Sequence, residues 1–425
     1  MASIIILLVV AGCVAYQYLK GNLTRAVATI IVIIFASMVA FGYFEWLAGF
    51  FLSKGSDSRF PALVPWAQPL CFMLLFILVF AVLQTGVMQV MKQPVDFGLL
   101  PERIGRVVCG IFMGLFLSGL LLTVAGMAPL PHGYPYERFD QRNPRPDQPN
   151  KVLLNVDGLV TGWFSMVSKG SFSAISSPQS FAALHPDYLS QMYLNRLGAS
   201  ETVPLVAPAD AINAPNKAGY WYAPENLKDM DDQIISPESG HTLMVVRIGV
   251  RKRHVRDAGS FTPSQVRVVC KRTATADDAL AGQGVNVYPL GYLAGKNIVQ
   301  VKRLTEAITV TREDIAEGET GRWIDFVFQV PSGHEPVLAE FKLGSVVRLS
   351  SLASADQIPA PAYFQGGSGQ DEQNDEDNDN ASGQQNRQGA QSNQNSSTRE
   401  NDGSGLSTVG KTLTGGALEE DMQLQ

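Results

Sequence analysis

The sequence predicts a membrane α-helical bundle of four transmembrane helices, then a mostly antiparallel β-sandwich domain with one or two short helices, and a disordered C-terminal tail. Three observations carry this fold class. Roughly the first 130 residues are extremely apolar, apolar and polar residues alternate beyond about residue 240, and the end of the chain is polar and repetitive. We expect a four-helix transmembrane domain at 1–128, a linker at 129–150, a helical or irregular connecting region at 151–239, the β-sandwich at 240–364 and the disordered tail at 365–425.

The four membrane spans are predicted by length and by the absence of charge. A helix needs about 20 mostly apolar residues to cross the hydrocarbon core of a bilayer. The windows without an internal charge are 2–19, 26–44, 65–91 and 107–128. A soluble protein with four such windows in succession would have almost no polar surface, so the lipid bilayer is the expected surrounding of this region.

Glycines in the fourth window need an explanation, because each glycine weakens an isolated helix by about 1 kcal/mol relative to alanine. Gly110, Gly114 and Ser118 recur every four residues and so form a stripe of small side chains. Such stripes let two membrane helices approach closely. We therefore expect helix packing at Gly105, Gly110, Gly114 and Ser118, within the chain or in a homo-oligomer through this helix. Pore lining by the same face is the alternative.

The orientation in the membrane follows from the first helix. Lys20 and Arg25 come directly after it, and no basic residue precedes it. The total number of basic residues is equal on the two sides, but flanking charges of the first helix usually dominate. This predicts a cytoplasmic first turn and, after four spans, a periplasmic soluble part.

In the soluble part, two segments have helical spacing and the later segments alternate. The segment 153–168 predicts an amphipathic helix that lies on the following domain or on the membrane surface, and 186–197 predicts a second short helix. Alternation with a period of two is typical of half-buried strands. It occurs at 246–251, 265–270, 297–304, 307–312, 323–330 and 337–352.

Basic residues cluster around the sequence RKRHVR at 251–256. One interpretation is a surface for an anionic partner such as an envelope protein or polymer, and the other is a solvated hairpin turn with basic strand faces. No nucleic acid partner is expected. The residues of the expected surface are Arg247, Arg251, Lys252, Arg253 and Arg267.

The remaining composition contains no pattern for a cofactor, a metal or catalysis. Three of the four cysteines lie in apolar windows, Cys270 stands alone, and the five histidines are scattered. From Asp371 onward the chain has eleven acidic and three basic residues and almost no large apolar ones, so this tail cannot form a core. We expect no catalytic residue, no metal and no cofactor, and hence no enzyme.

The order of features in the first 128 residues resembles the colicin V production protein family (CvpA). Members have four helices, a basic turn with glycine after the first, and a closing helix in which glycines follow an arginine. The matching residues here are Lys20, Gly21, Arg25, Arg103, Gly105, Gly110 and Gly114. The chain departs from many members in having no aspartate near the start of its first helix. The resemblance implies an integral inner-membrane protein linked to toxin production or export and to envelope maintenance.

These observations together predict an inner-membrane scaffold of the colicin V production type that displays a β-sandwich for binding envelope components. An oligomeric channel or exporter component is the alternative. A membrane-tethered hydrolase is less favoured, although a branch of the family carries a trypsin-like protease. The only serine in a suitable context is in GGSGQD at 366–371, inside the polar tail.

Overall fold

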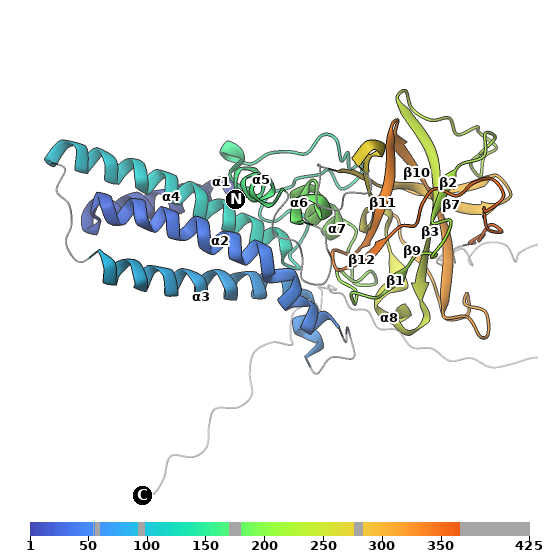
Figure 1. Cartoon of the computed structure of the whole chain (residues 1–425), viewed down its shortest axis with the longest axis horizontal. Helices are drawn as coiled ribbons and strands as arrows, with labels where there is room; N and C mark the ends of the chain where they lie inside the picture. Colours follow the sequence, from blue (N-terminus) through green and yellow to red (C-terminus); the bar gives the residue numbers. More distant parts are fainter. Residues whose placement is uncertain (54, 56–59, 92–97, 170–179, 276–283, 366–425) are drawn as a thin grey trace, which may run out of the picture. The chain divides into compact units, whose positions relative to one another are not determined.

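Four long helices open the chain, as the apolar windows predict (Figure 1). The computed structural model describes residues 1–53, 55, 60–91, 98–169, 180–275 and 284–365, so the expected disordered tail lies outside the described residues beyond 365. The helices are α1 (Ala2–Lys20), α2 (Leu23–Leu52), α3 (Ala67–Val90) and α4 (Leu99–Met127), with the short 3-10 helix η2 (Pro61–Trp66) before α3. All four have the length and composition of membrane spans.

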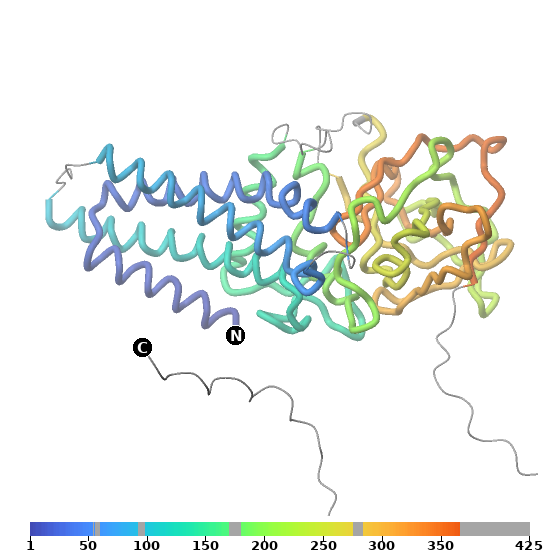
Figure 2. The backbone as a smooth tube through the Cα atoms, turned by 90° about the horizontal axis from the view of Figure 1, so that it is seen from below, coloured from blue at the N-terminus to red at the C-terminus, as the bar shows by residue number. Residues whose placement is uncertain are grey.

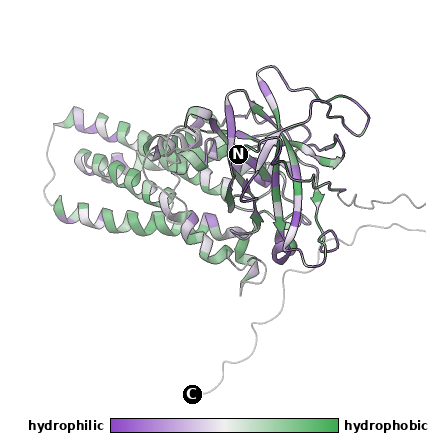
Figure 3. Ribbon diagram, turned by 45° about the vertical axis from the view of Figure 1, so that its right-hand side comes forward, coloured by the Kyte–Doolittle hydropathy of each residue, from purple (hydrophilic) through white to green (hydrophobic). Residues whose placement is uncertain are grey.

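Helices that follow one another in the chain are antiparallel, and the turn between α1 and α2 is short. Asn22 caps α2 by accepting a hydrogen bond from the backbone N–H of Thr24 at 3.1 Å. Gln84 of α3 donates through Nε2 to the Thr29 hydroxyl of α2 at 3.3 Å, which connects the two helices by a polar contact. Figure 3 shows these helices as mostly hydrophobic, in contrast to the mixed strands that follow.

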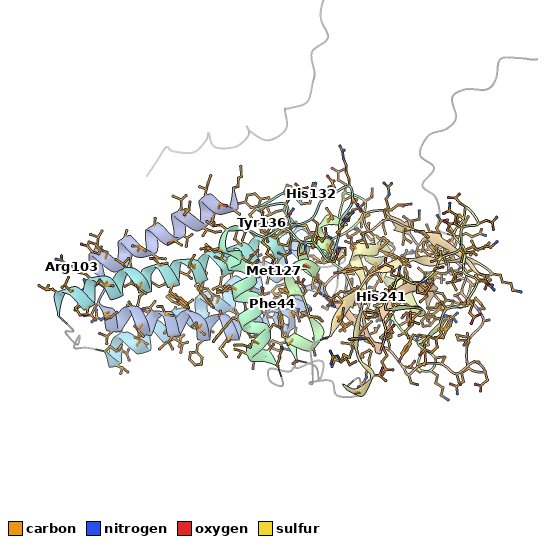
Figure 4. The ribbon with its side chains drawn as sticks, turned by 90° about the horizontal axis from the view of Figure 1, so that it is seen from above. Phe44, Arg103, Met127, His132, Tyr136 and His241 are labelled. Atoms are coloured by element: carbon orange, nitrogen blue, oxygen red, sulfur yellow. The ribbon has the colours of Figure 1, made fainter. Side chains whose placement is uncertain are left out.

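The N-terminus and the soluble part lie at the same end of the bundle. Ala2 and Ile6 of α1 form one buried cluster with Val152 and Val156, which follow the last membrane helix. Figure 4 shows Arg103 at the other end of the bundle, away from His241 in the sheets. The basic turn after α1 is therefore at the opposite end from the sheets.

A layer of short helices joins the bundle to the sheets. Its members are α5 (Val156–Ser168), α6 (Phe181–Leu184) and α7 (Tyr188–Leu197), with the short η3 (Leu153–Asn155) before α5. In Figure 2 this green part of the tube lies between the blue helices and the orange strands. Phe41 of α2 stacks on Phe164 of α5 at 4.9 Å between ring centroids and lies 5.9 Å from Phe181 of α6. The end of α2 therefore belongs to this layer as well as to the membrane.

The strands form antiparallel sheets, as the alternation predicts. The larger sheet has the order β1-β3-β10-β7-β8 with β2 also paired to β3, the second has the order β12-β11-β5-β6, and β4 pairs with β9. The named strands are β1 (Ile212–Asn213), β2 (Tyr220–Tyr222), β3 (His241–Arg251), β4 (Ser260–Phe261), β5 (Val266–Arg272), β6 (Val285–Val287), β7 (Pro289–Gly295), β8 (Ile298–Val301), β9 (Ile308–Thr309), β10 (Gly321–Pro331), β11 (His334–Phe341) and β12 (Ser345–Arg348).

The main core of the sandwich lies between the two larger sheets. Alternate residues of β3 and β10 face alternate residues of β5 and β11, so the period of two places one side chain in two in this core. Full burial of each Val, Ile or Phe side chain stabilises the fold by about 1.5–3 kcal/mol. Prominent members of this cluster are Val246, Ile248, Val250, Val266, Val268, Phe326, Phe328 and Phe341.

Two boundaries differ from the expected organisation. Pairing in the large sheet begins at β1 and β2, upstream of residue 240, and these strands are too short to produce a visible alternation. The expected linker at 129–150 is not a free spacer, because Arg138 and Phe139 are buried. The backbone N–H of Asn150 donates to the Arg138 carbonyl at 2.8 Å, which closes the segment on itself.

Candidate functional site

The small-residue stripe of α4 lies against α1. A Cβ atom added at Gly110 would lie 2.8 Å from the Cα of Val14, and one added at Gly114 would lie 2.6 Å from the Cα of Val10. Backbone atoms cannot move aside as the end of a side chain can. These two glycines therefore allow a close approach of the two helix backbones, in the manner typical of small-residue membrane interfaces.

The other two residues of the predicted packing set are also enclosed within the chain. A Cβ atom at Gly105 would lie 2.6 Å from the Cδ1 atom of Leu23 in α2. Ser118 is completely buried, and its hydroxyl donates to the carbonyl of Leu115 at 2.8 Å. In this arrangement a homo-oligomer through the stripe would have to displace α1, and the stripe does not line an open path.

A buried polar cluster, which we call the junction cluster, connects the membrane bundle to the sandwich. It consists of Glu45 from α2, His185, Gln191 from α7, Arg267 from β5 and Glu340 from β11. His185, Arg267 and Glu340 are each at least 97% buried. Buried charges are tolerated only when they are paired and hydrogen-bonded, and this cluster contains two carboxylates opposite an arginine and a histidine.

The contacts within the junction cluster favour a protonated His185. Gln191 donates through Nε2 to Oε1 of Glu340 at 2.7 Å, so its own Oε1 must act as an acceptor toward Nδ1 of His185 at 2.9 Å. The other ring nitrogen of His185 lies 2.8 Å from Oε1 of Glu45. Nη2 of Arg267 also lies 3.3 Å from Nδ1. The carboxylates of Glu45 and Glu340 beside the ring favour an imidazolium that carries both protons.

The electrostatics of the cluster agree with this protonation. Burial lowers the pKa of His185, but Glu45 and Glu340 raise it by more, and the net direction is upward even though Arg267 lowers it. Arg267 pairs with Glu340 and donates to the Leu184 carbonyl at 2.8 Å. The cluster thus holds two positive and two negative groups around one short loop.

Further polar contacts fix the same junction from both sides. Gln68 of α3 donates to the carbonyl of Leu343, beyond β11, at 2.9 Å. Arg196 of α7 donates to the carbonyl of Ala125 in α4 at 2.9 Å. The sandwich and the helices are consequently held together by directional bonds in addition to apolar packing.

Two members of the expected anionic-partner surface are not on a surface, and this corrects the sequence interpretation. Arg247 is buried and binds Asp325 through two hydrogen bonds of 2.6 and 2.8 Å, and Arg267 belongs to the junction cluster. Both partners lie directly across an antiparallel strand pair, Asp325 opposite Arg247 and Glu340 opposite Arg267. The acidic residues inside the strand segments were the available signal, but their strand register could not be read from the sequence.

The other three residues of that expected surface lie near the end of β3. Arg251 and Arg253 both pair with Asp210, and His254 lies 3.0 Å from the same carboxylate. Lys252 is half-buried. The positive charge of this turn is therefore partly neutralised within the chain.

A pocket of about 440 Å³ lies on the sandwich, and no local pattern in the sequence predicts it. It lies beside β2, β11 and the end of β12. The hydroxyl of Tyr220 donates a hydrogen bond to Glu335 at 2.8 Å. Burial is the main cause that raises the pKa of Tyr220, and this hydrogen bond raises it further. Arg348 is an exposed cation at the same pocket, and Ser350 and Ser351 add hydroxyl groups. This lining suits a polar ligand.

The short motifs have structural roles where they are described. Asp187, in the sequence HPD at 185–187, caps α7 by accepting a hydrogen bond from the backbone N–H of Ser190 at 3.1 Å. The sequence GQGVNV at 282–287 ends in β6, while GGSGQD at 366–371 lies outside the described residues. Among the residues that the structure describes, no three His, Cys, Asp or Glu side chains are grouped to hold a metal ion.

No family model, curated protein or solved structure matches this chain. The resemblance to the colicin V production family therefore stays a prediction.

We predict that Gly110→Leu or Gly114→Leu will lower the thermal stability of the purified protein in detergent. A leucine at either position must displace the α1 backbone, and overpacking of this kind costs about 1–3 kcal/mol. Gly12→Leu and Gly86→Leu are matched controls, because a Cβ atom at either glycine meets no heavy atom within 4 Å. Equal melting temperatures for all four variants would contradict the packing role.

A second prediction concerns pH and the junction cluster. Because the folded-state pKa of His185 is raised above 6.5, its stabilisation is fully present below pH 6.5 and is lost as pH rises through the raised value. One proton changes the unfolding free energy by at most about 1.4 kcal/mol per pH unit. The difference in melting temperature between the parent and His185→Gln should therefore shrink as pH rises.

The control for this experiment is His132→Gln, which changes an exposed histidine outside the cluster. Its difference from the parent should not vary with pH. If His185→Gln and the parent melt with the same pH profile, His185 does not bind its proton more tightly in the folded state.

Proposed function

We propose that this chain is an inner-membrane scaffold of the colicin V production type, linked to toxin production or export and to envelope maintenance. Its sandwich binds an envelope component at the periplasmic face. The observation that carries the proposal is the junction cluster, which connects Glu45 of a membrane helix to Arg267 and Glu340 of the sandwich through His185 and Gln191. A binding domain held in this way stays at one place on the membrane.

The energetics of buried ion pairs support a fixed attachment. Removing one partner from a buried pair typically costs about 3–5 kcal/mol, because the other charge is left without compensation. Separation of the sandwich from α2 would expose His185 and Glu340 to water or leave their charges without a partner. The sandwich therefore acts together with the bundle, which is the property required of a scaffold.

The basic residues that flank the first helix support a periplasmic sandwich. The totals on the two sides are equal, but the flanks of the first helix usually decide its orientation, and the positively charged flank stays in the cytoplasm. The end opposite the sandwich carries Lys20, Arg25, Arg103 and Arg106. Only Arg106 of these is paired with an acidic residue, Glu102, among the described residues.

The sandwich pocket is the proposed ligand site. Its carboxylate, guanidinium and hydroxyl groups can bind a polar polymer through several hydrogen bonds at once, and Arg348 is exposed and available to a ligand carboxylate. Hydrogen bonds to charged groups contribute about 1.5–3 kcal/mol each. A glycan or peptide of the cell wall has this chemistry.

The orientation can be tested by labelling single cysteines in a chain whose four native cysteines are replaced by alanine. Ser239→Cys lies in an exposed loop of the sandwich, and Leu99→Cys lies at the exposed start of α4 at the other end of the bundle. With the outer membrane permeabilised, an impermeant maleimide should label position 239 and should label position 99 only after lysis. The reverse pattern would place the sandwich in the cytoplasm and end the envelope proposal.

Binding can be tested by co-sedimentation of the purified full-length protein with isolated cell-wall sacculi. Arg348→Glu should weaken sedimentation about tenfold or more, because it replaces a favourable charge in the pocket by a repulsive one. Arg312→Glu makes the same charge change at an exposed position outside the pocket and serves as the control. Equal sedimentation of both variants and the parent would exclude this pocket as a cell-wall site.

A further inference from the structure

Helix α5 lies at the level of the bilayer. A Cβ atom added at Gly119 of α4 would collide with the backbone carbonyl of Val156 and lie 2.7 Å from the Cγ2 atom of Val160. Gly119 is inside the apolar span Leu99–Met127, well before its end. The start of α1 packs on Val156 as well. Helix α5 therefore crosses the bundle where the membrane ends of the helices lie.

The two faces of α5 differ as expected for a helix in the headgroup region. Val156, Val160 and Phe164 face the bundle and are buried. On the other side Leu159 is 50% exposed and Met166 is 56% exposed, together with the exposed indole of Trp163. An amphipathic helix of this kind lies in the membrane interface, with its apolar face among the lipid chains and its polar groups at the headgroups.

A pocket of about 280 Å³ opens beside the polar side of α5 and the start of α7. Lys151 and Lys169 lie near the two ends of α5, are exposed and have no ion-pair partner among the described residues. The lining also includes Arg138, Thr161, Ser165 and Asp187. The three cationic side chains Arg138, Lys151 and Lys169 therefore outnumber the single lining carboxylate, Asp187.

Arg138 adds a buried cation without a direct counterion. Its side chain is only 6% exposed, and it donates to the hydroxyls of Tyr136 and Ser190, both at 3.2 Å. No carboxylate of a described residue lies within ion-pair distance, and its Nε atom has no hydrogen-bond partner there. Asp157 is reached only through the Tyr136 hydroxyl, which donates to it at 2.5 Å. An anion in the pocket would complete this arrangement.

We propose that this pocket binds the phosphate of an anionic phospholipid from the leaflet in which α5 lies. The cations of Arg138, Lys151 and Lys169 suit a phosphate, and Ser165 can donate a hydroxyl hydrogen bond to it or to a glycerol headgroup. The exposed face of α5 lies beside the acyl chains of the same lipid. This site does not depend on the proposed envelope ligand of the sandwich.

The test uses the full-length protein in dodecyl maltoside, with tryptophan fluorescence and the melting temperature as readouts. The probes are dioctanoyl phosphatidylglycerol, dioctanoyl phosphatidylcholine and soluble glycerol 3-phosphate. Phosphatidylglycerol should bind and raise the melting temperature, whereas phosphatidylcholine should bind at least tenfold more weakly. Affinity for glycerol 3-phosphate equal to that for phosphatidylglycerol would show that a free phosphate compound, not a lipid, is the ligand and would overturn the proposal.

The matched variants change only exposed lysines, so the fold is retained. Lys151→Gln combined with Lys169→Gln should weaken phosphatidylglycerol binding about tenfold or more, since each basic residue near anionic lipid contributes about 1 kcal/mol. Lys217→Gln combined with Lys296→Gln removes the same charge from exposed positions of the sandwich and should leave binding unchanged. Equal affinities of the two double variants, or equal binding of the two lipids by the parent, would overturn the proposal.

Discussion

The buried pairing of Arg267 with Glu340 is the interaction on which the junction between membrane and sandwich depends. The two residues face each other across adjacent strands, so the register of the sheet sets their separation. Glu340 also orients Gln191, which fixes the hydrogen bonds of His185, and His185 in turn reaches Glu45 of α2. Each charge in this series is satisfied only if the next element is in place. Strand pairing in the sandwich and helix position in the membrane are therefore linked through polar groups.

The parts of the fold that the sequence could predict are those with a long, repeated pattern. Four apolar windows were sufficient to predict the membrane-type helices, and alternation was sufficient to predict β3 and β10. The strands β1 and β2 are too short to show a period. Arg247 was placed on a surface because alternation sets it opposite Val246 and Ile248. A second buried cluster, with Trp221 among its members, covers that face too, so Arg247 is enclosed. The residues that cover this face come from short or irregular segments outside β3. The sequence of β3 itself therefore gives no sign that Arg247 is covered.

The candidate sites show the same limit. The glycines of α4 could be assigned to packing because their spacing of four residues is local, and the structure provides α1 as the neighbouring helix. The junction cluster could not be predicted, because its five members come from positions far apart in the chain and none of them lies in a recognisable sequence motif. The expected amphipathic helix at 153–168 was correct as an element, and its contact with Gly119 now gives its level in the bundle.

The contact between α1 and the glycines of α4 has a consequence for biosynthesis. Helix α1 leaves the ribosome before α2, α3 and α4, so the small-residue interface cannot form while the intervening helices are being made. Until then α1 is surrounded by lipid, which solvates its apolar side chains as well as a protein neighbour would. The contact between α1 and α4 therefore forms only after α4 has been made. The buried cluster of Ala2 and Ile6 with Val152 and Val156 is completed later still, once the residues that follow α4 have been made.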